Sequence, residues 1–215
     1  QQANDAGDHI VESDNVSTTQ VGYLTEPRSN PVVSNFTFIS RGHDDIFKLK
    51  EGVSGQYYNG VAAVLNEASG KSTGCIETTL AETASDGAST PKFSFNSVAF
   101  DCDSYIATDR DDTANPPTGA TIAQIQTIVE AGSNNLYGAN SGGGTYVNNL
   151  GKERNSSNAL VNSGYGVVVN GPTETAATAT PVPAAHNYDG FFNVPSTTAQ
   201  PTYIGAVSGA TDDWY

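Results

Sequence analysis

Three short stretches decide the fold: NFTFI at 35–39, NGVAAV at 59–64 and NSVAF at 96–100. Each begins with an asparagine and continues as an apolar run of the length of a β-strand. Their separations fall in the range of about 20–50 residues that is typical of repeat proteins. The chain therefore repeats one strand-forming unit, with loops of different length between the copies.

A second short strand follows each of these runs, and the three second strands contain Ile46, Ile76 and Ile106. A fourth such strand, around Ile10, precedes the first run. The order strand, turn, strand, long loop predicts an all-β fold, a parallel β-solenoid of about three to four coils. A β-sandwich is the competing architecture, because it also uses short strands and frequent turns.

The repeated asparagine has a physical role in such a fold. Asn tolerates the left-handed backbone conformation that a sharp turn between strands requires. Stacked coils would place Asn35, Asn59 and Asn96 about 4.8 Å apart, so that their amides form a ladder. The alternation of side chains predicts a solenoid interior made of Phe36, Phe38, Val61, Ala63, Val98 and Phe100.

The chain contains two cysteines, Cys75 and Cys102. They lie near the second strands of adjacent predicted coils, which brings them close to the distance that a disulfide bond needs. We expect them to be bonded, and two free buried thiols are the alternative.

The pattern changes after residue 109, and we expect coils over 1–109 and a loop-rich cap over 110–215. The segment TIAQIQTIVEAG at 121–132 predicts one amphipathic helix with Ile122, Ile125 and Val129 on its apolar face. A helix beside a solenoid is typical of an end cap that shields the last coil.

Several motifs carry a resemblance to a known family, and they occur in the same order along nearly the whole chain. They are GDHIVESDN, PRSNPVVSNFTFI, KEGVSGQYYNGV, FDC and the closing YIGAV and DDWY. The chain resembles the C-terminal part of a family of secreted or lipid-anchored bacterial proteins with a right-handed parallel β-helix. The resemblance implies that fold and an extracellular, periplasmic or outer-membrane surface location. It implies no activity, because the members are mostly uncharacterised.

Composition excludes some functions. Twenty-three acidic and nine basic residues give a formal charge of −14, which repels nucleic acid and favours cations. No apolar run is long enough for a transmembrane helix. The chain contains no Met, so we expect a processed or fragmentary product of a longer protein.

Catalytic signals are weak. The three histidines lack metal-ligand spacing, and no nucleophile or phosphate-binding motif is present. We expect no enzyme and no resident cofactor, with calcium as the one ion that the ligand types favour. The calcium candidates are Asp44, Asp45, Asp109, Asp111 and Asp112.

We expect a non-enzymatic structural or assembly component outside the cell. The predicted first strand, near residues 9–12, would leave an open edge that additional coils, a protein partner or a second copy must cover. The alternative is a polysaccharide-binding or polysaccharide-cleaving β-helix, in which exposed tyrosines stack on sugar rings. Its candidates are Tyr57, Tyr58, Tyr105 and Tyr137.

Overall fold

A computed structural model describes residues 9–15, 25–40, 45–64, 74–79, 93–102, 104–107, 120–138, 144–145, 174, 176–182 and 200–208. These residues form eight β-strands and one α-helix. The elements are β1 (Val11–Ser13), β2 (Val32–Ser40), β3 (Phe47–Leu49), β4 (Gln56–Val64), β5 (Gly74–Thr78), β6 (Ser94–Asp101), β7 (Ser104–Ala107), α1 (Ile122–Glu130) and β8 (Leu136–Tyr137).

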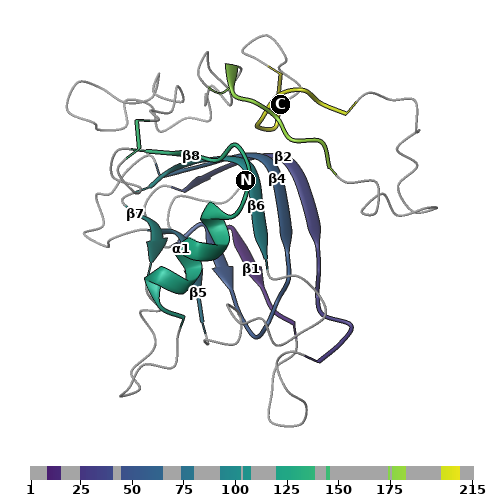
Figure 1. Cartoon of the computed structure of the whole chain (residues 1–215), viewed down its shortest axis with the longest axis vertical. Coiled ribbons are helices and arrows are strands. Elements are labelled where there is room, and N and C mark those ends of the chain that lie inside the picture. The colour runs from purple at the N-terminus through teal and green to yellow at the C-terminus, as the bar shows by residue number, and fades with distance from the viewer. Residues whose placement is uncertain are drawn as a thin grey trace.

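Successive strands alternate between two sheets (Figure 1). Sheet A has the order β1-β3-β5-β7, and sheet B has the order β2-β4-β6-β8. Every neighbouring pair in both sheets is parallel. The mostly-β class that the repeats predicted is therefore confirmed, with one helix beside two parallel sheets.

The register of sheet B confirms two members of the predicted asparagine ladder and corrects the third. Ser34 lies opposite Tyr58 and Phe36 opposite Gly60, so Asn35 and Asn59 occupy the same level. Tyr58 in turn lies opposite Asn96. The residue level with Asn59 is therefore Ser97, and Asn96 lies one position too early.

Backbone conformation explains this correction. Asn35, Asn59, Ser97 and Asn134 all have positive φ angles, between 53° and 57°. In β6, serine adopts the left-handed conformation that asparagine adopts in β2 and β4. The repeated feature is thus the bend in the backbone, and the residue type follows it only in part.

The bend also corrects the predicted interior. Phe36, Val98 and Phe100 belong to the main core, as expected, and Phe38 packs against it partly buried. Val61 and Ala63 instead contribute to a second cluster on the opposite face. In β4, Gly60 faces the core, since the ring of Phe36 occupies the space where a Cβ atom of residue 60 would lie.

In sheet A, one predicted strand pairing is confirmed and two predicted positions are wrong by one residue. Ile76 and Ile106 are paired in register, as predicted. Their partner in β3 is Phe47, and the partner of Phe47 in β1 is Val11. Ile46 and Ile10 each precede the aligned position by one residue.

Aromatic rings fill the space between the two sheets. Tyr57 and Phe95 stack with centroids 4.8 Å apart. Phe47, from sheet A, packs edge-on against both, at 4.9 and 5.2 Å. Few long aliphatic side chains are needed in this core, because each aromatic ring buries a large area.

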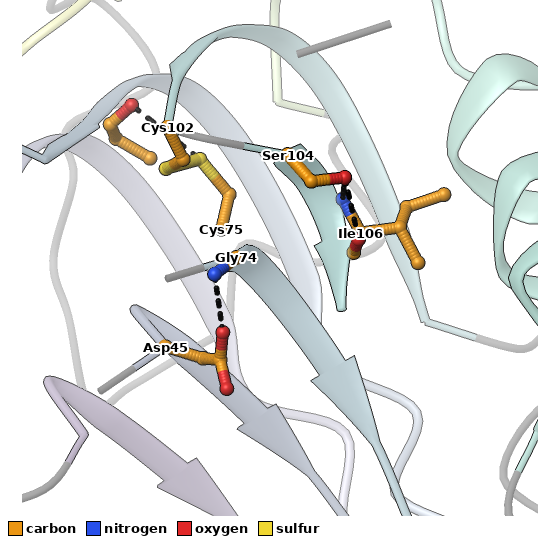
Figure 2. Close-up of a disulfide and its surroundings, with 7 residues drawn as sticks. Asp45, Gly74, Cys75, Cys102, Ser104 and Ile106 are labelled. Carbon is orange, nitrogen blue, oxygen red and sulfur yellow. Dashed lines mark hydrogen bonds between the residues drawn. A yellow bond between two sulfur atoms is a disulfide. The ribbon is translucent and has the colours of Figure 1, made fainter. Parts of the chain in front are cut away.

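The predicted disulfide bond is confirmed. Cys75 lies in β5 and Cys102 directly follows β6, and their Cα atoms are 5.6 Å apart (Figure 2). The bond joins sheet A to the end of a sheet B strand across 27 positions of sequence. It therefore ties consecutive turns of the chain together.

The predicted helix is confirmed as α1, with one correction to its apolar face. Ile125, Ile128 and Val129 are buried, whereas Ile122 is 48% exposed. Thr121 and Gln124 form a capping box at the start of the helix. At its other end Glu130 accepts a hydrogen bond from Tyr105 of β7 at 2.9 Å, so α1 packs on the last strand of sheet A.

Strand β8 lies within the predicted cap region, 110–215, yet it is the last strand of sheet B. Asn135, just before it, accepts a hydrogen bond from the Val98 amide and donates to the carbonyls of Phe95 and Val129. This end of the two sheets is closed by side-chain contacts as well as by α1.

Candidate functional site

A cluster of buried charges distinguishes sheet A from the aromatic core beside it. Lys48 of β3 and Glu77 of β5 are direct partners across the parallel pair. The Lys48 Nζ and Glu77 Oε1 atoms are 3.1 Å apart. Lys48 is 9% exposed and Glu77 is 1% exposed, so this ion pair is largely removed from water.

Asp45 completes the cluster. It is fully buried, and one of its carboxylate oxygens accepts a hydrogen bond from the Gly74 amide at 2.5 Å (Figure 2). Burial raises the pKa of Asp45 to about 8, and the adjacent Glu77 carboxylate adds to the shift through a side-chain hydrogen bond and charge repulsion. Asp45 is therefore a neutral acid at pH 7, in hydrogen-bond contact with Glu77.

Two further groups surround this cluster. The ring nitrogen Nδ1 of His9 lies 3.3 Å from the Asp45 carbonyl oxygen. Glu12 of β1 is the partner of Lys48 on the other side, but it contacts Lys50 at 2.6 Å. The hydrogen bond from Lys50 lowers the pKa of Glu12. This second ion pair is half exposed, so solvent screening leaves it little stabilising effect.

The N-terminal edges of the two sheets are formed by β1 and β2. Among the described residues, no strand pairs with the outer edge of either one. Val11, Val33 and Phe38 are only partly buried against the core, and Ile10 is 38% exposed. The predicted open edge is thus present within the described part of the chain.

The asparagines do not bond to one another, which corrects the second part of the ladder prediction. Asn35 donates to the Tyr203 carbonyl at 2.8 Å. The Asn59 amide donates to the Thr180 carbonyl and accepts from the Thr180 amide, at 3.0 and 2.7 Å. Asn96 accepts from the amide of Ser133 at 3.0 Å. Each amide binds the backbone of a later segment, and in Asn35 and Asn59 this side chain lies at the bend.

Two C-terminal segments, 176–182 and 200–208, consequently lie over the bend of sheet B (Figure 1). Ile204, Ala177 and Ala179 pack on Val61, Ala63 and Ala99. Amides of Gly205 and Ala206 bond to Asn59 and Thr37. These segments cover apolar residues that a coil of sheet B would otherwise expose.

The calcium prediction concerns five aspartates. Of the five candidate aspartates, only Asp45 is described; Asp44, Asp109, Asp111 and Asp112 lie outside the described residues. Asp45 binds the Gly74 amide. Within the described ranges, no group of three or more His, Cys, Asp or Glu side chains is arranged to hold a metal ion.

The predicted tyrosine platform is wrong. Tyr57 is fully buried, and Tyr58 and Tyr105 are 5% and 6% exposed. Tyr137 packs partly buried against the same core and stacks on Phe100. The register places Tyr57 and Tyr137 on the interior side of the bent strands, so both rings pack against the core and do not form an exposed platform.

Comparison of the chain with protein-family models, with curated proteins and with solved structures found no match. In the described part of the chain, no helix has the length and apolar character needed to cross a membrane.

The buried cluster was not predicted from the sequence, although a signal exists. Lys48 follows Phe47 in the same way that Glu77 follows Ile76, and those apolar residues are register partners. A correct alignment of the second strands would have placed opposite charges side by side. Aligning Ile46 with Ile76 instead hides the pair.

Proposed function

We propose that this chain is a right-handed parallel β-helix whose role is structural, as an assembly component outside the bacterial cell. The alternation of successive strands between two parallel sheets carries the proposal, because it is the path of a chain wound into coils. Crossovers between parallel strands are nearly always right-handed. The Cys75–Cys102 bond and the acidic composition are consistent with an extracellular or periplasmic location.

The assembly role rests on the difference between the two ends. α1 and Asn135 close the C-terminal end, whereas β1 and β2 are the outermost strands of their sheets in the described part of the chain. No Lys, Arg, Asp, Glu or Pro interrupts β2, VVSNFTFIS. Edge strands that must stay unpaired usually carry such residues. An added parallel coil would continue both sheets.

A single hydrogen-bond donor allows a test. The Gln56 amide donates to the Pro31 carbonyl, and backbone groups alternate sides along a strand, so Ser34 presents its N–H to the open edge. Ser34→Pro removes that donor without breaking a bond to β4. Proline is tolerated at such edge positions. Ser34→Ala, which keeps the N–H, is the matched control.

We expect the wild-type chain and Ser34→Ala to self-associate with rising concentration in sedimentation experiments, and Ser34→Pro to remain monomeric. Hydrogen exchange should show fast exchange at Val32 and Ser34 in the dilute wild-type monomer. A wild-type chain that stays monomeric at high concentration, with an exposed and ordered edge, contradicts the assembly role.

Carbohydrate recognition is the less supported function, since three of the four candidate tyrosines are buried and Tyr137 is partly buried. Binding of the purified chain on a glycan array, lost in a Tyr58→Ala variant that remains folded, would reverse this preference.

A further inference from the structure

The Lys48, Glu77 and Asp45 cluster has the components of a self-forming amide bond. We propose that Lys48 and Glu77 become joined by an isopeptide bond between Nζ and Cδ, with Asp45 as the proton relay. This modification would be made by the chain itself and would link β3 to β5. It is independent of the assembly function proposed above.

Position favours the reaction. The reacting pair is held as direct partners of two parallel strands, with the Lys48 nitrogen 3.1 Å from a Glu77 carboxylate oxygen. Fixing two groups in contact replaces a bimolecular encounter by an intramolecular step, which is worth many orders of magnitude in rate. Strand pairing maintains this contact for the lifetime of the folded protein.

Burial supplies the second requirement, which is a pair of uncharged reactants. Amide formation needs a neutral amine and a protonated carboxyl group. Transfer of one proton from Nζ to the carboxylate gives both neutral reactants at once, and a site with little water solvates the two separated charges poorly. The side chain of Lys48 is 11% exposed and that of Glu77 is 1% exposed. The same exclusion of water disfavours hydrolysis of the amide once it has formed.

Asp45 supplies the third requirement, an acid and base beside the reacting carboxyl group. Its burial and its contact with Glu77 raise the pKa of its own carboxyl group to about 8, so at neutral pH it holds a proton. The Gly74 amide fixes the orientation of this carboxyl group. Carboxyl groups in such surroundings commonly act as general acids.

The step balances without any external reactant. A proton passes from Lys48 to the carboxylate pair, and the free amine then attacks Cδ of Glu77. Asp45 donates its proton to the departing hydroxyl oxygen and recovers one from the nitrogen. The C–O bond breaks, the C–N bond forms, and one water molecule leaves.

The test is a peptide map of the folded wild-type chain, reduced and alkylated to open the disulfide. Trypsin does not cut after an acylated lysine, so residues 42–50 should remain in one piece. We expect that piece to be joined to the peptide 72–92, which contains Glu77, with a combined mass lower by one water molecule. Fragmentation should place the link between Lys48 and Glu77.

Three variants define the mechanism. Lys48→Arg keeps a positive charge but cannot form the bond, and Glu77→Ala removes the acceptor, so both should lack the branched peptide. Asp45→Asn should form it at least tenfold more slowly after refolding. Separate, unmodified peptides in the wild-type map would overturn the proposal. A link from Lys48 to Asp45 would overturn the assignment of Glu77 as acceptor, and an unchanged rate in Asp45→Asn would overturn the relay.

Discussion

The two sheets share one winding of the chain but are stabilised differently. Sheet B matches side chains by size, since the Phe36 ring fills the space left by Gly60. Sheet A matches side chains by charge, since Lys48 lies beside Glu77 with Asp45 adjacent. A fixed parallel register permits matching by size and matching by charge, because it gives each side chain one defined neighbour on the adjacent strand. The difference implies that sheet B is sensitive to volume and sheet A to pH.

The largest effect is expected at Gly60. A Cβ atom at this position would lie 2.0 Å from the Phe36 ring, so Gly60→Ala forces the ring out of its place. We expect a loss of about 3 kcal/mol in the free energy of unfolding, as for other overpacked cores.

Chemical denaturation measures that loss, and the double variant Gly60→Ala with Phe36→Val supplies the control. The smaller residue at 36 should recover part of the stability, because the two positions share one space. Additive losses would show that Phe36 and Gly60 are not coupled.

The disulfide bond joins the two sheets, so its removal should weaken both. Cys75→Ala with Cys102→Ala opens a loop of 27 positions, which corresponds to about 3 kcal/mol in the chain-entropy model. Cys75 is fully buried and Cys102 is 4% exposed, and alanine leaves a small cavity without an unpaired polar group. Thermal unfolding of the reduced wild-type chain should give a similar decrease in Tm. No change in either experiment would contradict a stabilising bond.

The pH dependence of stability should originate in sheet A. The pKa of Asp45 is about 8 in the folded protein, against 3.8 for an ordinary aspartate in water. Between these values the folded state binds one more proton than the unfolded state, so this group makes stability fall as pH rises. Below the unfolded pKa its penalty disappears, and above pH 8 it is constant.

Asp45→Asn removes that proton while preserving an acceptor for the Gly74 amide. We expect the variant to lose less stability than the wild type between pH 5 and pH 8, by about 1–2 kcal/mol, the typical penalty of a poorly solvated polar group. Urea denaturation at several pH values measures the slope. Glu12→Gln, at the exposed end of the same sheet, is the control and should leave the slope nearly unchanged. A steeper slope in Asp45→Asn would contradict the raised pKa.

Much of this arrangement could be predicted from local patterns. Asn35 and Asn59 correctly predicted that their strands are neighbours, and Cys75 and Cys102 correctly predicted that two consecutive turns of the chain lie together. The prediction for Asn96 was wrong because Ser97 adopts the left-handed conformation in that strand. Residue propensities do not suggest this for serine. One residue of slip exchanges the two faces of a strand. The same slip, which aligned Ile46 with Ile76, hides the charged pair of sheet A.

The smallest expected effect concerns Asn59, which has two roles. Its backbone forms the bend in β4, and its side chain hydrogen-bonds to the backbone of Thr180. Asn59 has a φ of 54° and makes two hydrogen bonds with the Thr180 backbone. Asn59→Gly loses the hydrogen bonds but accepts the bend without strain. Asn59→Ala loses both, so it should be less stable than Asn59→Gly by about 1 kcal/mol. Hydrogen exchange at Thr180 should increase equally in both variants, because neither retains the acceptor. If Asn59→Gly were the less stable variant, the bend would contribute nothing, and the amide alone would explain why asparagine lies at this level of sheet B.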